Sequence, residues 1–196
     1  MKESHYAVYL RARDYWNSRF NDIHVPIVYL HGRELLLANP AADADIVVPA
    51  ILLHDVGWKS ISEANQKRAY GPAPEDESLV RVHEREGVRI AGEILVGLNY
   101  EPRKSEAILR IIDGHDSRQQ AISLEDALVK DADKVWRFTP VAVDYHHRLF
   151  DQQLAEYVRW LAGQFERWVF YTQRGKQMAR EQLDVVQRAM AEVGHV

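Results

Sequence analysis

The 196-residue sequence contains no cysteine. Disulfide bonds and thiolate metal sites are therefore excluded, and any bound metal must be held by histidine, carboxylate, water or substrate. There is also no run of about 18 apolar residues, so we expect no membrane-spanning helix. The N-terminal stretch MKESHYAVYLRARDYWNSRF is charged throughout and lacks the apolar core of a secretory signal. We therefore expect a cytoplasmic protein.

Neither sign of charge dominates the chain, which has 25 Lys and Arg against 29 Asp and Glu, a net charge of −4. This balance provides no global attraction to a nucleic-acid polymer or to a membrane surface, and neither is expected as a partner. A hydrophobic content of 46% and a charged content of 28% are ordinary for a soluble globular protein. The length suits a single domain.

Segments with the alternating period of strands, internal repeats and low-complexity tracts are absent, whereas helical periodicity recurs along the chain. We predict seven helices, over residues 28–38, 47–57, 79–96, 103–114, 124–138, 141–170 and 176–193. Pro49 is tolerated in the second helix if that helix begins only just before it. The fold class is therefore all-α. Residues 59–77 are polar and are predicted to form a long surface loop, which either covers a site and selects substrate or merely connects two helices.

Metal-competent side chains stand where the apolar faces of these helices should continue. They are His31, His54 with Asp55, His83, His115 and Asp133. A single buried histidine is most often a hydrogen-bonded core residue. Several helices that each direct such a group inward indicate a metal site, because histidines and carboxylates are costly to bury separately and satisfy one another around a cation. His54 and Asp55 diverge by about 100° on a helix, which suits two ligands of one ion or a carboxylate that bridges two ions.

The ordered motifs LLHDVG, VHEREGVRIAGEIL, IIDGHD and LVKDADKV resemble those of the HD-domain superfamily of metal-dependent phosphohydrolases. The resemblance covers about residues 23–138 and implies an all-α HD-domain bundle. We expect one domain over residues 1–196, with a helical extension over about 141–193. The resemblance also implies two divalent metal ions, with iron or manganese ahead of cobalt, nickel and zinc. The first would be held by His31, His54, Asp55 and Asp133, and the second by His83 and His115, with Asp55 as the bridge.

This resemblance implies that metal-activated water cleaves a phosphate ester or anhydride of a small molecule, such as a nucleotide. Mixed-valent di-iron oxygenases share the scaffold and the ligand set, so an oxygenase is the alternative. A non-catalytic metal-binding sensor is a third reading. The Gly-Tyr-Pro element of the cyclic-dinucleotide phosphodiesterases is absent, and that substrate is set aside.

Basic residues near the motifs are candidates for binding the phosphorylated substrate, because a transferred phosphoryl group needs positive charge beside the metals. They are Lys59, Arg118 and Lys134, joined by His146 on the next helix. Lys134 is adjacent to Asp133 and is, with Asp55, a catalytic candidate. The aromatic residues between Trp160 and Tyr171 are expected in the core or in a homodimer interface.

Overall fold

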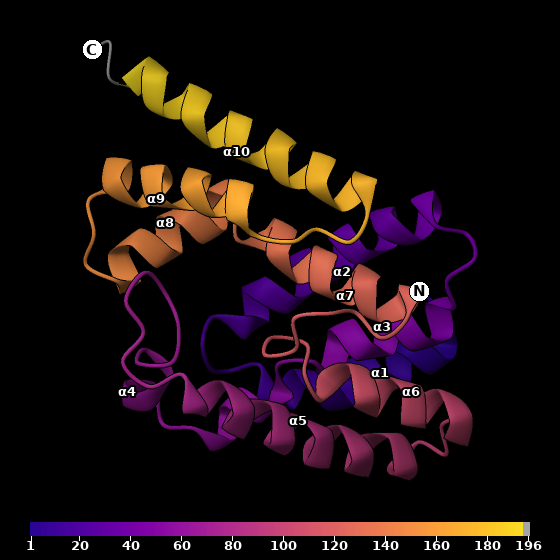
Figure 1. Cartoon of the computed structure of the whole chain (residues 1–196). Coiled ribbons are helices and arrows are strands. Elements are labelled where there is room, and N and C mark those ends of the chain that lie inside the picture. The colour runs from indigo at the N-terminus through magenta and orange to yellow at the C-terminus, as the bar shows by residue number, and fades with distance from the viewer. Residues whose placement is uncertain (194–196) are drawn as a thin grey trace.

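The computed structural model describes residues 1–193, and all regular structure within them is helical, which confirms the all-α prediction (Figure 1). The α-helices are α1 (Glu3–Ala12), α2 (Asn21–Ala38), α3 (Ala44–Leu53), α4 (Glu63–Gln66), α5 (Ser78–Gly97), α6 (Pro102–Ile112), α7 (Leu124–Trp136), α8 (Pro140–Leu149), α9 (Leu154–Arg167) and α10 (Gln173–Val193). Two short 3-10 helices are η1 (Arg13–Tyr15) and η2 (Val56–Ser60). None of the described helices combines the length and the apolarity that crossing a bilayer requires.

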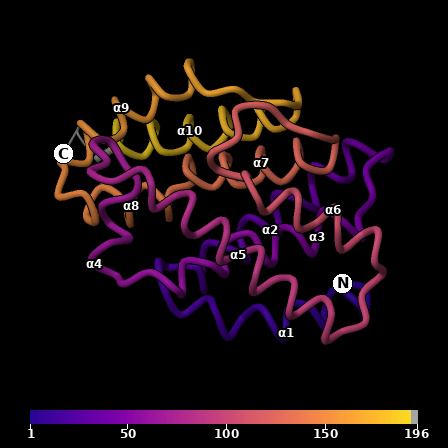
Figure 2. The backbone as a smooth tube through the Cα atoms, turned by 60° about the horizontal axis from the view of Figure 1, so that its bottom comes forward, coloured from indigo at the N-terminus to yellow at the C-terminus, as the bar shows by residue number. Residues whose placement is uncertain are grey.

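The helices are arranged in three layers (Figure 1). The central layer contains α1, α2, α3 and α7, and α5 and α6 cover one side of it. The C-terminal helices α8, α9 and α10 cover the other side, with α10 alongside α7 (Figure 2). One continuous cluster of buried apolar residues extends from Val8 on α1 to Val186 on α10. This packing places α7 between the other layers, so the polar residues of α7 face groups from both ends of the sequence.

Local signals fix the ends of α7. The Ser123 hydroxyl accepts a hydrogen bond from the Asp126 N–H at 3.2 Å, which caps the start of the helix. Beyond its end, the Thr139 hydroxyl caps α8 by accepting from the Ala142 N–H at 3.3 Å. Pro140 then occupies the first position of α8, where its missing N–H costs nothing. The chain therefore turns at Thr139-Pro140 and α8 starts in a new direction.

The expectation that α3 begins only just before Pro49 is wrong, because α3 begins at Ala44 and Pro49 lies inside it. A proline in this position cannot donate to the carbonyl of Asp45, one turn earlier. The Tyr100 hydroxyl donates to this carbonyl instead, at 2.7 Å. The donor of this hydrogen bond lies 55 positions away from its acceptor in the sequence. Because the interaction that allows Pro49 inside the helix is distant, the sequence around Pro49 did not indicate where the helix starts.

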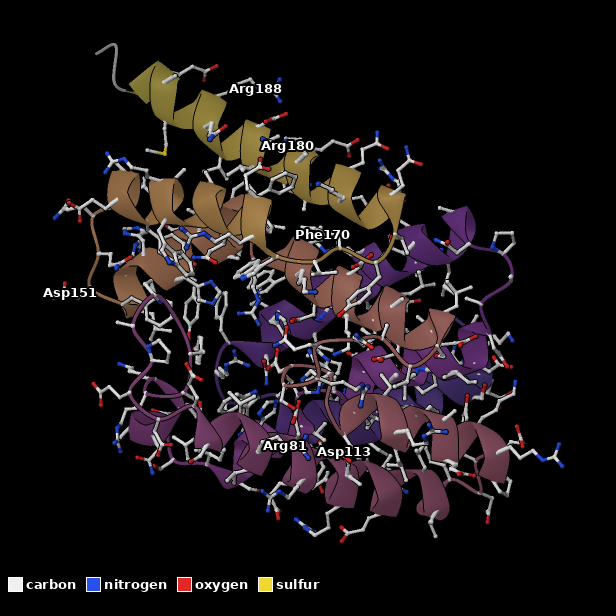
Figure 3. The ribbon with its side chains drawn as sticks, in the orientation of Figure 1. Arg81, Asp113, Asp151, Phe170, Arg180 and Arg188 are labelled. Atoms are coloured by element: carbon white, nitrogen blue, oxygen red, sulfur yellow. The ribbon has the colours of Figure 1, made fainter. Side chains whose placement is uncertain are left out.

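The single helix predicted over residues 141–170 is also wrong, because the chain forms α8 and α9 with a turn between them. Asp151 in this turn has a left-handed backbone with φ of 51° (Figure 3). Aspartate tolerates that conformation better than most residues, and the polar sequence Asp151-Gln152-Gln153 offers no apolar side chain that would favour a continued helix. The turn folds α9 back onto α8.

Candidate metal centre

Six histidine and aspartate side chains from five segments meet in the interior of the bundle, with a seventh side chain, Asp116, beside them. Three overlapping groups have ligand atoms within 4.8 Å of one another: His24, His54 and Asp133; His54, Asp55 and His115; His83, His115 and Asp116. His24 comes from α2, His54 follows α3, His83 comes from α5, His115 and Asp116 follow α6, and Asp133 comes from α7. The structure therefore brings together five of the six residues predicted as ligands: His54, Asp55, His83, His115 and Asp133.

The first donor group is built around His24. Its Nε2 lies 3.1 Å from the Nε2 of His54 and 3.2 Å from Oδ1 of Asp133. Oδ2 of Asp55 lies 3.4 Å from the same nitrogen. Three ligand atoms from two other segments thus lie within 3.4 Å of the His24 nitrogen.

The second donor group is built around His83 and His115, whose Nε2 atoms are 3.3 Å apart. Oδ2 of Asp116 lies 3.6 Å from the His83 nitrogen and 3.8 Å from the His115 nitrogen. The His83 ring stacks on Trp58 with a centroid distance of 4.1 Å, which fixes the ring plane.

Asp55 joins the two groups, because its oxygens point in opposite directions. Oδ1 lies 3.5 Å from Nε2 of His115, whereas Oδ2 faces His24. Each oxygen also accepts one hydrogen bond, Oδ1 from the Trp58 indole N–H and Oδ2 from Arg19, both at 3.1 Å. A carboxylate held in this way can present one oxygen to each donor group.

The donor chemistry fits divalent cations. The Nδ1 atoms of His54 and His115 donate to the carbonyls of Ile51 and Ile112, at 2.7 and 3.0 Å, so each Nε2 faces the centre. Burial lowers the pKa of both rings, but Asp55 and the neighbouring carboxylates outweigh it and raise both pKa values, that of His115 to about 9, so a bound metal would have to displace these protons. Nitrogens that bind one ion at about 2.1 Å and at right angles lie about 3 Å apart, close to the observed separations of the Nε2 atoms. Burial lowers the pKa of His24 to about 4 and that of His83 to about 3, so both rings are neutral at pH 7, the form that binds metal.

The carboxylates are ionised despite their burial. Burial opposes the charge of Asp55, but His54 and Arg19 hold its pKa well below the usual range. Burial also opposes the charge of Asp133, but Arg137 and His54 hold its pKa well below the usual range. The centre therefore combines imidazole nitrogens with anionic oxygens, the donor set that iron, manganese and zinc accept.

The prediction of His31 as a ligand disagrees with the structure, in which His24 takes that place. His31 belongs to none of the donor groups found in the described residues. It lies two turns further along α2, and at 1.5 Å per residue the two rings are about 10 Å apart along the axis. Burial lowers the pKa of His31, and this histidine packs in the core as a neutral residue.

Sequence reasoning missed His24 because the predicted helix began at residue 28, whereas α2 begins at Asn21. The signal was present, since His24, Val28 and Leu35 share one face of the longer helix. Asp116, which directly follows His115, was also missed. It stands in a turn after α6, where no periodicity indicates the direction of a side chain.

Close backbone contact between η2 and α5 brings Asp55 and His83 together. A Cβ on Gly57 would lie 1.9 Å from the carbonyl oxygen of His83, so only glycine fits there. Gly87 of α5 faces the carbonyl of His54, 3.4 Å from where its Cβ would be. These two glycines let η2 and α5 approach without intervening side chains.

The turn that carries His115 and Asp116 is held by two buried charges. The ammonium of Lys130 donates to the carbonyls of Gly114 and His115, each at 2.7 Å. On the other side, Glu84 accepts from the N–H groups of Asp116 and Ser117, at 3.0 and 2.8 Å. Lys130 and Glu84 thus satisfy backbone groups of a turn that lies beyond the end of α6.

We predict that Glu84→Gln lowers the free energy of unfolding by about 2 kcal/mol and weakens metal binding, because an amide cannot accept every hydrogen bond that the buried carboxylate accepts. Urea denaturation and metal titration measure the two effects. Glu93→Gln on the same helix is the control, because Glu93 forms an exposed pair with Arg89 whose loss should change stability little. Equal stability of the two variants would contradict the prediction.

A cavity of about 430 Å³, here called the metal-side cavity, opens beside His115, Asp116 and Asp133. Its lining is strongly basic: Arg118, Lys130, Lys134, Arg137 and Arg167. Arg137, which was not predicted, reaches both donor groups, with Nη2 at 3.3 Å from Asp133 and 3.5 Å from Asp116. The cavity thus offers cations next to the donor groups, as binding of an anion would require.

The four predicted substrate-binding residues occupy different places. Lys134 and Arg118 line the metal-side cavity, although Arg118 also pairs with Asp126 at 2.9 Å. His146 is buried and lines a neighbouring cavity. Lys59 is exposed, donates to Asn17 at 2.6 Å and is not part of either lining, which disagrees with the predicted role.

The segment between α9 and α10 forms a wall of the metal-side cavity, through Trp168, Val169 and Tyr171. Asp131 anchors this segment by accepting from the Tyr171 N–H at 2.9 Å. Lys134 donates to the carbonyl of Val169 at 2.5 Å. Neighbouring Phe170 packs toward Phe138, so the aromatic residues of this region form core and cavity wall within one chain (Figure 3).

A comparison with protein families matches one region of the chain. The family model described as HD domain matches residues 21–137, which include every residue of the three donor groups. Searches of curated proteins and of solved structures found no match. The matched range covers more than half of the chain.

Proposed function

The chain belongs to the HD-domain family, and from this premise we propose that it is a phosphohydrolase with two divalent metal ions that cleaves a phosphate ester or anhydride of a small molecule. The observation that carries the proposal is the pair of donor groups that share Asp55 and open onto a cation-lined cavity. The residues proposed as ligands are His24, His54, Asp55, His83, His115, Asp116 and Asp133.

When bound, two divalent ions would supply an activated water and would neutralise charge on the phosphoryl group. The chain supplies the remaining functions. Arg19 and Trp58 hold Asp55 in the orientation that reaches both donor groups. Arg137 and Lys134 bind phosphoryl oxygens from the cavity side and stabilise the charge that develops there.

The test is a screen of metal-loaded protein against phosphomonoesters, phosphodiesters and nucleotides, with phosphate release as the readout. Turnover that is abolished by chelation is expected. Absence of turnover with iron, manganese, cobalt, nickel and zinc would refute the proposal.

Lys134 and Lys59 form a matched pair for testing where the phosphate binds. We predict that Lys134→Met raises the KM for the phosphorylated substrate about tenfold, because the lysine lines the metal-side cavity. Lys59→Met should leave the KM unchanged, because Lys59 is exposed and pairs with Asn17. Steady-state kinetics measure both. Equal effects of the two substitutions would contradict this placement of the phosphate.

A mixed-valent di-iron oxygenase is the second candidate, because the same histidine and carboxylate donors bind iron and a basic cavity also suits a phosphonate. Oxygen consumption by reduced, iron-loaded protein with polyols or phosphonates distinguishes it from the hydrolase. If Asp55→Asn changes only the melting temperature and no activity is found with any metal, the sensor reading is favoured instead.

A further inference from the structure

A second cavity, of about 270 Å³, adjoins the metal-side cavity. Half of the residues that line it have aromatic rings, and we call it the aromatic side pocket: Tyr70, Phe150, Tyr157, Trp160 and Trp168. Tyr70, Arg137 and Trp168 line both cavities, so the two spaces lie on either side of the same three residues. A molecule whose phosphate lies against Arg137 would have its next atoms at the entrance of this pocket.

The charge of the lining selects among possible occupants. Arg137 is the one charged side chain among the described residues that line the pocket, and no carboxylate is part of the wall. A quaternary ammonium group would find aromatic faces there but also the guanidinium of Arg137, which repels it. An uncharged ring can stack on the aromatic wall without that repulsion.

The pocket also offers polar atoms for a ring that carries hydrogen-bonding groups. His146 is 7% exposed, and its Nδ1 has no hydrogen-bond partner among the described residues. Gln164 of α9 contributes an amide to the wall. Buried polar atoms without partners are rare, and a bound molecule is one way of satisfying them.

The segment 59–77 closes one side of the pocket, through Tyr70, Gly71 and Pro72. Gly71 has a φ of 106°, and a Cβ on it would lie 2.5 Å from the Phe150 ring. Tyr70 packs edge-on against Phe150 and holds Arg19 over its ring at 4.0 Å. The segment therefore packs against Phe150 at the end of α8, beside the pocket.

We infer that the aromatic side pocket binds an uncharged aromatic ring attached to the phosphate, so that the preferred substrates are phosphates that carry such a ring. The claim about substrates rests on the proposed function. The binding preference of the pocket itself does not require turnover. It also assigns the loop 59–77 to substrate selection.

Phenylphosphonate and methylphosphonate are the probes, because neither can be hydrolysed at a phosphate ester bond and they differ only in the ring. Isothermal titration of manganese-loaded and metal-free protein gives both dissociation constants. Wild-type protein is expected to bind phenylphosphonate about tenfold more tightly in each form, the effect of one well-packed aromatic contact.

Two variants change the pocket in opposite ways. Gln164→Trp fills it from α9 and should remove the preference, and Trp160→Leu takes away aromatic wall and should reduce the preference several-fold. Gln187→Trp, at an exposed position of α10, is the control and should keep the full preference for phenylphosphonate. Melting temperatures establish that each variant is folded.

Equal affinity for the two probes in wild-type protein, failure of both to bind, or an unchanged preference in both pocket variants would overturn the inference. A retained preference without any phosphate turnover would instead refute the proposed function and leave the pocket assignment standing. The two failures are therefore distinguishable.

Discussion

Asp55→Asn is expected to lower turnover by about 10³-fold or more and to reduce the number of bound metal ions from two to one or none. Aspartate supplies one oxygen to each donor group, with Oδ1 at 3.5 Å from His115 and Oδ2 at 3.4 Å from His24. Asparagine keeps the shape but has one oxygen and no charge, so one group loses its ligand. Metal content after gel filtration and steady-state kinetics measure the two effects.

The control for this substitution is Asp113→Asn. Asp113 lies just ahead of the His115 turn but is half-exposed, and its carboxylate pairs with Arg81 outside the centre (Figure 3). It should retain both metal ions and full turnover. If Asp55→Asn also retained both ions, Asp55 would not be the bridging ligand.

The second large effect is a contrast between two histidines of α2. His24→Ala is expected to lose one metal ion and nearly all turnover, because the Nε2 of His24 lies within 3.4 Å of atoms from His54, Asp55 and Asp133. His31→Ala is expected to retain both metal ions and turnover. Metal stoichiometry and kinetics of the two variants provide the comparison.

The pair is well matched, since His24 is 6% and His31 is 9% exposed and both rings are removed from the same helix. Both substitutions create a cavity, so both should lower the melting temperature by similar amounts. A difference in metal content therefore reports ligation rather than stability. Loss of metal from His31→Ala, with retention in His24→Ala, would reinstate the ligand set inferred from sequence.

Local sequence was sufficient wherever the determining interactions are short-range. Apolar periodicity predicted a helix over 124–138, and α7 spans Leu124–Trp136, with Ser123 capping its start and Thr139 capping the helix that follows. The HD-domain membership also followed from the sequence, because the motifs are contiguous. The predictions failed where the decisive partner is distant, as at Pro49, where Tyr100 supplies the missing hydrogen bond.

The site divides in the same way. Its residue types and five of the residues in its donor groups could be predicted because polar groups interrupt apolar faces at recognisable motifs. His24 and Asp116 were missed, since one requires the true start of α2 and the other lies in a turn that Glu84 and Lys130 hold. No local sequence pattern predicts the position of Arg137 either, because only the packing of α7 against the C-terminal helices places this cation at both cavities.

The sequence by itself determined that the chain is a helical bundle of the HD-domain family with a histidine and carboxylate centre, because periodicity and motif order are properties of neighbouring residues. Only the tertiary structure decided which histidine of α2 faces that centre, that Asp55 lies between two donor groups, and that basic and aromatic cavities meet at Arg137. Those facts depend on how helices far apart in the chain pack, and packing directions are set by the whole core rather than by any one segment.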